Sequence, residues 1–144
     1  MSKIIPFIPA HVDLMDVRQS ELDGIGSNCL DRYKLLAENA VGFTLIHDGR
    51  IIMAFGYYEL WPGVMEIWVI PSAYTHQYPN TVARTMLRYM ASFIASHKPH
   101  RLQTAALDDD FHSRFMEFMG FVKEGTMEQY SVDKKRYNMW AKIL

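Results

Sequence analysis

The residues best suited to chemistry lie in one stretch, from Val64 to His97. An apolar run that predicts a strand ends at Pro71, a short polar loop follows, and VARTMLRYMASFIASH has the spacing of an amphipathic helix. The first turn of a helix has unpaired backbone N–H groups and the positive end of the helix dipole, so this arrangement can bind an anion. We therefore predict that a phosphate-bearing cofactor binds where a helix begins at Asn80.

Glu66 is the acidic residue on the predicted strand. Alternation along a strand places Glu66 on the same face as Trp68 and Ile70, and opposite Ile67 and Val69. A carboxylate beside an indole in a partly dry cleft is suited to accept a proton as a general base. The alternative interpretation is a glutamate that simply faces solvent.

Bulk composition predicts one globular domain over residues 1–144, with 49% apolar and 22% charged residues. The net charge of −1 gives no sign of a nucleic-acid partner. Cys29 is the only cysteine and has no internal disulfide partner, which favours a reducing compartment, and we expect the cytoplasm. No apolar run reaches the roughly 18 residues of a membrane span, so no membrane association is expected.

Strands and helices can be placed on either side of the central stretch. The pattern predicts a strand over Ile4–Ile8, a helical segment that ends at Gly24 or Gly26, and a second helix over Cys29–Ala40 with Asn28 as its N-cap. Asp48-Gly49 is a strong hairpin signal, and with the turn at Trp61-Pro62-Gly63 it predicts a three-stranded antiparallel meander from about Phe43 to Ile70.

The C-terminal part predicts a parallel pairing and a closing hairpin. The strand Arg101–Leu107 follows a helix, which permits a parallel crossover. A helix is expected from the run Asp108–Asp110 to Gly120, with an apolar stripe of Phe111, Phe115 and Phe118. An antiparallel pair around Asp133-Lys134 ends the chain. The class is therefore α+β (mixed α/β), a mostly antiparallel sheet of six to seven strands flanked by about four helices.

Four pieces of the chain together resemble the GNAT family of acyl-CoA-dependent N-acetyltransferases. They are the hairpin DGRIIMAFGYYEL, the strand end EIWVIPSAY, the long helix after it, and DDFHSRFMEFMGFVKEG, which is the most specific. The resemblance covers nearly the whole chain. It implies a GNAT-like fold, acetyl-CoA as cosubstrate, and direct transfer of an acetyl group to an amine of a protein or small molecule.

The resemblance also implies roles for individual residues. Glu66 would be the general base, and a backbone N–H near Val69 would donate to the oxyanion. Tyr74 would give a proton to the leaving thiolate, with Tyr78 as the other nearby hydroxyl; both residues can instead be loop aromatics packed on the sheet edge. The remaining cofactor contacts would be Ile67, Val69, Thr75, His76, Gln77, Asn80, Thr81, Asp109 and Phe115. His76 can equally have no role.

Departures from the family pattern support an alternative. No glycine occurs between Gly63 and Gly120, so Gln77 and Asn80 stand where the phosphate loop usually has glutamine or arginine and then glycine. Met116 stands where the family often has a tyrosine. The C-terminal half is also similar to small GNAT-like proteins of short-tailed phages. The alternative is therefore a catalytically degenerate GNAT-fold phage protein that acts as a binding or virion-assembly module.

Other features give weaker expectations. The six histidines lack metal-ligand spacing, so no metal is expected. The family resemblance implies an amine substrate or a protein as the partner, recognised through the loops Arg18–Cys29 and Ser131–Tyr137. Exposed strand edges are compatible with a homodimer. Cys29 is expected to be buried, and a phage-encoded protein would act in the host cytoplasm.

Overall fold

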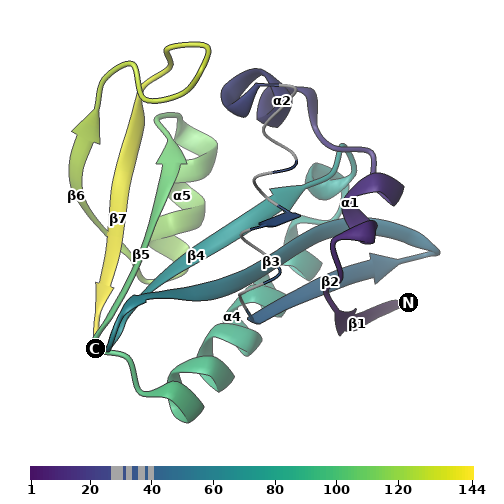
Figure 1. Cartoon of the computed structure of the whole chain (residues 1–144), viewed down its shortest axis with the longest axis horizontal. Coiled ribbons are helices and arrows are strands. Elements are labelled where there is room, and N and C mark those ends of the chain that lie inside the picture. The colour runs from purple at the N-terminus through teal and green to yellow at the C-terminus, as the bar shows by residue number, and fades with distance from the viewer. Residues whose placement is uncertain (27–30, 32–33, 36–37, 39–40) are drawn as a thin grey trace. The chain divides into compact units, whose positions relative to one another are not determined.

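The computed structural model describes residues 1–26, 31, 34–35, 38 and 41–144. It has the predicted α+β class, with seven strands in one mixed sheet of order β1-β2-β3-β4-β5-β7-β6. The elements are β1 (Ser2–Pro6), α1 (Ala10–Leu14), α2 (Gln19–Ile25), β2 (Val41–His47), β3 (Arg50–Trp61), β4 (Val64–Pro71), the 3₁₀ turn η2 (Thr75–Gln77), α4 (Pro79–His97), β5 (Arg101–Leu107), α5 (Asp110–Phe118), β6 (Val122–Met127) and β7 (Tyr137–Ile143) (Figure 1).

The chain forms two compact units. The first contains Met1–Tyr58 and Ile67–Pro79, and the second contains Glu59–Glu66 and Asn80–Leu144. Strands β3 and β4 each run through both units, whereas β1, β2, α1 and α2 belong to the first. Strands β5, β6 and β7 and helix α5 belong to the second.

The hairpin of the first unit confirms the prediction made from Asp48-Gly49. His47 pairs with Arg50, and the two turn residues have φ of 49° and 76°, the left-handed values of a tight type I′ turn. β1 pairs antiparallel with β2 over Ser2–Pro6, two residues earlier than the predicted Ile4–Ile8. The strand ends early because the N–H of Ile8 lies 3.4 Å from Nδ1 of His11 and α1 follows directly.

The prediction of a single helical segment up to Gly26 is wrong in one respect, because the chain forms two short helices, α1 and α2, there. Met15 is extended (ψ 149°), and the chain then pairs with the end of β4 through an antiparallel bridge between Val17 and Ser72. Backbone bonds to the strand replace those of a helix turn, which no local pattern reveals. Gly26 ends α2 with φ of 81°, as predicted. The predictions for Asn28 and Cys29 lie outside the described residues.

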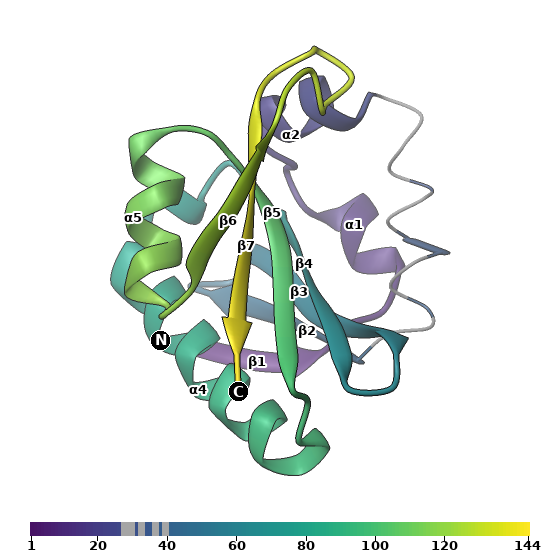
Figure 2. The same ribbon diagram turned by 90° about the vertical axis from the view of Figure 1, so that its left-hand side faces the viewer.

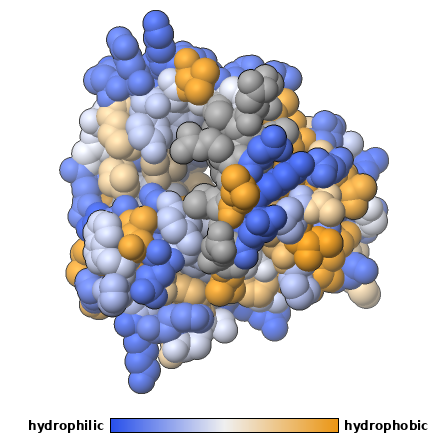
Figure 3. Space-filling model, in the orientation of Figure 1, coloured by the Kyte–Doolittle hydropathy of each residue, from blue (hydrophilic) through white to orange (hydrophobic). Residues whose placement is uncertain are grey.

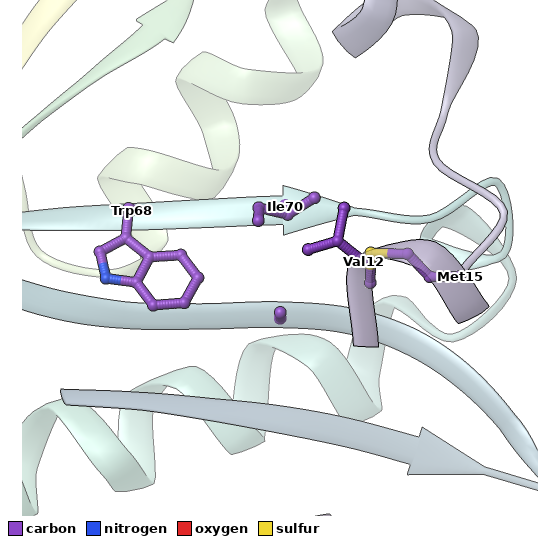
Figure 4. Close-up of a cluster of buried hydrophobic side chains, with 5 residues drawn as sticks. Val12, Met15, Trp68 and Ile70 are labelled. Carbon is purple, nitrogen blue, oxygen red and sulfur yellow. The ribbon is translucent and has the colours of Figure 1, made fainter. Parts of the chain in front are cut away.

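The core of the first unit is built around Trp68. Its indole lies against Gly42 and Gly56, which pair directly across β2 and β3. Val12 and Met15 of the α1 segment pack with Trp68, Ala54 and Ile70, and Figure 4 shows Val12 beside Ile70 of β4. Because an indole occupies the surface of the β2–β3 pair, both positions are confined to glycine.

The second unit contains the predicted parallel pairing. Val64, Met65 and Glu66 of β4 pair in parallel with Arg101, Leu102 and Gln103 of β5, which confirms the crossover through α4. α4 is amphipathic as predicted, and it buries Val82, Met86, Met90 and Phe93. β7 pairs antiparallel with β5 on one side and with β6 on the other, and Figure 2 shows these three strands side by side.

Helix α5 has the predicted ends but a different buried face. Asp109 is its N-cap, and the N–H groups of Gly120 and Phe121 donate to the carbonyls of Glu117 and Met116, which is a Schellman C-cap. The predicted phenylalanine stripe is wrong, since Phe111 and Phe118 are exposed. The buried residues lie one position further along, at Met116 and Met119, whose flexible side chains suit irregular packing.

Strand β6 is the last strand in the order, and all its residues except Met127 are exposed. Figure 3 shows the exposed apolar side chains as separate groups among hydrophilic ones. Polar residues Lys123 and Glu124 on such an edge are typical of strands protected against chance pairing. The expected homodimer stays a prediction.

Candidate functional site

The loop after β4 is anchored to β3 by two hydroxyl residues. The N–H of fully buried Ser72 donates to the carbonyl of Ile52 at 3.0 Å. The Thr75 hydroxyl lies within hydrogen-bond distance of the same carbonyl (2.9 Å) and of the Ser72 carbonyl (3.0 Å). The backbone of Ser72 and the hydroxyl of Thr75 therefore hold the start of this loop against β3.

Most backbone N–H groups of this loop are already used inside the protein. Tyr74 donates to the Ser72 hydroxyl at 3.1 Å, and Ala73 to the carbonyl of Asp16 at 2.7 Å. The others donate to carbonyls of the same loop: Thr75 to Ser72, Gln77 to Tyr74, and Tyr78 to Thr75. Pro79 has no N–H. In this conformation, the main chain from Ala73 to Pro79 has few donors left for an anion.

Side chains of the loop instead meet basic residues of the first unit. The guanidinium of Arg50 lies 4.7 Å from the centre of the Tyr74 ring, a cation–π contact. The ring of Tyr78 lies 4.4 Å from that of His47. Tyr74 and Tyr78 are both half-buried, and the packing interpretation of these two aromatics therefore has direct support.

Arg18 reaches the same loop from the segment between α1 and α2. Its N–H donates to the carbonyl of Pro71 at 3.3 Å, and its Nη1 donates to Nε2 of His76. Its Nε is buried and, within the part of the chain that the structure describes, has no hydrogen-bond partner. Arg18 takes part in none of the ion pairs within the described part of the chain.

Helix α4 begins at Pro79, one residue before the predicted start at Asn80. Proline suits the first helical position because its missing N–H has no partner within the helix. Asn80 and Thr81 lie in the first turn, exposed and half-buried respectively. Asn80 is not among the residues with positive φ, so it does not adopt the backbone that a loop glycine would supply.

Glu66 lies opposite Gln103 at the third position of the parallel register and is half-buried. Gln103 in turn accepts a hydrogen bond from Nε of Arg101 at 2.9 Å. Burial does not alternate along β4, since Ile67 and Trp68 are both buried while Glu66 and Val69 are half-buried. This is the pattern of an interior strand covered on both faces.

Asp109 and Phe115 have structural neighbours on α5. The Asp109 carboxylate accepts from the backbone N–H of His112 at 2.7 Å, and the Nδ1 of the same histidine lies 2.7 Å away. Asp109 therefore caps the helix and holds an imidazole. Phe115 is half-buried, and Met116, which replaces the tyrosine of the family pattern, is buried.

The structure thus groups Tyr74, Thr75, His76 and Gln77 in one loop of the first unit. It also adds Arg18 and Arg50, which sequence reasoning did not select as cofactor contacts. Arg18 and His76 are 58 residues apart in the sequence, and the sequence carries no local signal for a contact between them.

Among the described residues, no group of three or more His, Cys, Asp or Glu is placed to hold a metal ion. The helices of the described part also include no apolar segment of the length that a membrane span requires.

Comparison with solved structures identifies the fold. The chain is similar to a GNAT-family acetyltransferase from Streptococcus pneumoniae, with a TM-score of 0.75, 12% identity, and coverage of 100% of this chain and 99% of that one. It is also similar to Ard1 from Thermoplasma volcanium, with a TM-score of 0.76, 15% identity, and coverage of 99% and 97%. A third similar structure is RimL, a ribosomal L7/L12 α-N-protein acetyltransferase in complex with coenzyme A. The TM-score is 0.75 at 13% identity, with coverage of 99% of this chain and 94% of that one.

These similarities show a GNAT-like fold over the whole chain. No family model matches the sequence, and no curated protein matches it either.

Proposed function

We propose that this protein is an acyl-CoA-dependent N-acyltransferase that transfers an acetyl group to an amine of a protein or small molecule. The observation that supports this most strongly is the fold, which matches GNAT acetyltransferases over 99–100% of the chain. Acetyl-CoA, when bound, supplies an acyl group activated as a thioester. The residues of this chain must hold it, take a proton from the amine and stabilise charge.

The proposed proton acceptor is Glu66. Glu66 is a half-buried carboxylate on an interior strand, and an ionised carboxylate can take the proton that the amine loses. In the reaction the amine nitrogen bonds to the acyl carbon, the carbon–sulfur bond breaks, and the thiolate takes a proton. Tyr74 is the proposed donor of that proton, and the N–H near Val69 is the proposed donor to the oxyanion.

Several of the proposed cofactor residues carry hydrogen-bond donors that can bind an anionic ligand. Thr75, His76 and Gln77 carry hydroxyl, imidazole and amide groups, and Arg18 adds a cation with a buried N–H that lacks a partner among the described residues. Asn80 and Thr81 lie in the first turn of α4, the positive end of its dipole. Ile67, Val69, Asp109 and Phe115 remain proposed contacts for the rest of the cofactor.

Two observations favour a second function. Most backbone N–H groups of the loop after β4 already donate within the protein, and Met116 is buried. A chain that cannot hold acetyl-CoA, and that has no tyrosine at this position of α5, would be a binding module on the same fold. The two functions differ in cofactor binding, since only the acyltransferase needs the thioester.

The test is release of free coenzyme A from acetyl-CoA in the presence of a panel of amines, followed by mass spectrometry of the acceptor. The panel includes peptides with free α-amino groups, because RimL is named as an α-N-protein acetyltransferase. We expect an acceptor that gains one acetyl group for each thiol released. Thiol release without acetylated product would be hydrolysis and would contradict the proposal.

A further inference from the structure

Gln103 lies beside the proposed base on the neighbouring strand. Glu66 of β4 and Gln103 of β5 are partners in the parallel register, so their side chains point to the same face of the sheet, on strands that lie about 4.8 Å apart. Both residues are half-buried, whereas Leu102, which points to the other face of β5, is fully buried. A carboxylate and a carboxamide therefore stand next to each other on a face that is not closed by packing.

The orientation of the Gln103 carboxamide is set by Arg101. Nε of Arg101 donates to Oε1 of Gln103 at 2.9 Å. Because a guanidinium has no acceptor, only the oxygen of the carboxamide can face it, and the amide N–H groups are turned away from it. Within the described part of the chain, these N–H groups have no hydrogen-bond acceptor. Gln103 thus offers donors beside the carboxylate of Glu66.

Arg101 is itself held by Glu124 of β6. Its Nη1 and Nη2 donate to the two carboxylate oxygens of Glu124 at 3.0 and 2.5 Å, so the guanidinium spans β7, which lies between β5 and β6 (Figure 2). The register of β6 and β7 shifts between Lys123 and Gly125, which makes Glu124 the extra residue of a β-bulge, a feature that redirects a side chain. A pair with two parallel hydrogen bonds fixes the plane of the guanidinium. Glu124 therefore fixes Arg101, and Arg101 fixes Gln103.

We propose that Gln103 determines which amines are accepted, because its amide N–H groups bind a carbonyl oxygen next to the amine that Glu66 deprotonates. The proposal rests on the proposed function for the role of Glu66. A carbonyl oxygen only accepts hydrogen bonds, which matches a carboxamide whose remaining groups only donate. The acceptor is then an α-amino carbonyl compound, such as the first residue of a peptide, in which one carbon carries both groups. Gln103 itself neither gives nor takes a proton.

Other amines fit this pair less well. An alkylamine, or the side chain of a lysine, has no oxygen beside its amine and leaves the donors of Gln103 without a partner. A site built to hydrogen-bond a substrate group discriminates against an analogue that lacks the group, because polar atoms of the site are then unpaired. The pair of Glu66 and Gln103 therefore favours α-amines that lie next to a carbonyl.

The experiment compares two acceptors, alaninamide and isopropylamine, which differ in a carboxamide that replaces a methyl group. The proteins are the wild-type chain, Gln103→Leu, Arg101→Met and a control, Arg88→Gln, whose side chain is exposed on α4. Arg101→Met removes only the group that orients Gln103, and it keeps the test valid if Gln103→Leu folds poorly. Thiol release at saturating acetyl-CoA gives kcat and KM for each acceptor. Circular dichroism and a thermal midpoint verify folding.

We expect Gln103→Leu to lower kcat/KM for alaninamide about threefold to tenfold, the range for one hydrogen bond, and mainly through KM. The value for isopropylamine should not change, so differences in the intrinsic reactivity of the two amines cancel. Arg101→Met should show a smaller loss, also confined to alaninamide, and Arg88→Gln should behave as wild type. Losses of equal size for the two acceptors, or no loss, in Gln103→Leu and Arg101→Met would overturn the proposal.

A second measurement needs no turnover. In isotope-labelled protein, the NMR signals of the Gln103 side-chain amide are identified by their absence in Gln103→Leu. Alaninamide should shift these signals and isopropylamine should not. A shift by alaninamide without any thiol release supports the acceptor site and contradicts the acyltransferase. Thiol release without a shift at high millimolar alaninamide overturns the role of Gln103 and leaves the acyltransferase standing, and the absence of both contradicts both.

Discussion

The indole of Trp68 lies so close to Gly56 that a β-carbon on Gly56 would come within 2.6 Å of it, and within 2.1 Å of the Val41 carbonyl. Real side chains do not tolerate such distances in a packed interior. Gly56→Ala should therefore destabilise the fold by about 1–3 kcal/mol, the usual cost of overpacking. Chemical unfolding in urea measures the change.

Gly125 in β6 provides the matched control. A β-carbon there would meet nothing within 4 Å, and its φ is not positive. Gly125→Ala should leave the free energy of unfolding within about 0.5 kcal/mol of wild type. Equal effects of the two substitutions would show that Trp68 does not confine Gly56.

Asp109 should contribute to stability as the N-cap of α5. Its carboxylate accepts from the N–H of His112 at 2.7 Å, so Asp109→Ala should cost about 0.5–2 kcal/mol of unfolding free energy. Asp109→Asn and Asp109→Ser should retain most of that stability, since both residues are good caps. Asp110→Ala is the neighbouring control. A loss of acetyl-CoA affinity in Asp109→Asn at unchanged stability would instead show a direct role in binding the cofactor.

His11 makes stability dependent on pH. The ring is buried, its Nδ1 lies 2.8 Å from the Thr44 hydroxyl, and burial lowers the pKa of His11 below its ordinary 6.5. The unfolded chain then binds more protons than the folded one, so this contribution is present above pH 6.5 and is lost as pH falls through that value towards the lowered pKa. Urea unfolding at pH 7.5 and pH 5.5 should show the loss in wild type and a smaller one in His11→Gln. Parallel losses in the two proteins would mean that other groups cause the dependence.

How much of this could be predicted from the sequence depends on how local each signal is. The Asp48-Gly49 hairpin and the Gly120 cap follow from residues that few other conformations suit. The parallel pairing of β4 and β5 follows from the helix between them. These features need only neighbours in the sequence or a topological rule.

Features set by distant contacts were not predicted. The break between α1 and α2 depends on the pairing of Val17 with Ser72, and the buried face of α5 depends on what packs beneath Met116 and Met119. The loop residues His76 and Tyr74 were selected from the sequence as site residues, and that role stays a prediction. Their partners Arg18 and Arg50 come from other elements, so the number of free donors in this loop could not be counted beforehand.

Glu66 should set the rate of acyl transfer if it is the base. Glu66→Gln should lower turnover by about 10²–10⁴-fold, the usual contribution of a general base, while the affinity for acetyl-CoA changes little. Glu59→Gln is the matched control, an exposed glutamate on β3. Steady-state thiol release with the best acceptor measures both variants. Full turnover in Glu66→Gln with a loss in Glu59→Gln would move the base to the neighbouring strand.

The central claim is that this GNAT-like fold binds acetyl-CoA, and calorimetric titration of acetyl-CoA into the wild-type chain tests it most directly. We predict one site per chain, together with a gain in unfolding free energy of about 2.7 kcal/mol at a hundredfold excess over the dissociation constant. A folded protein that shows neither heat of binding nor a stability change at millimolar acetyl-CoA would contradict it.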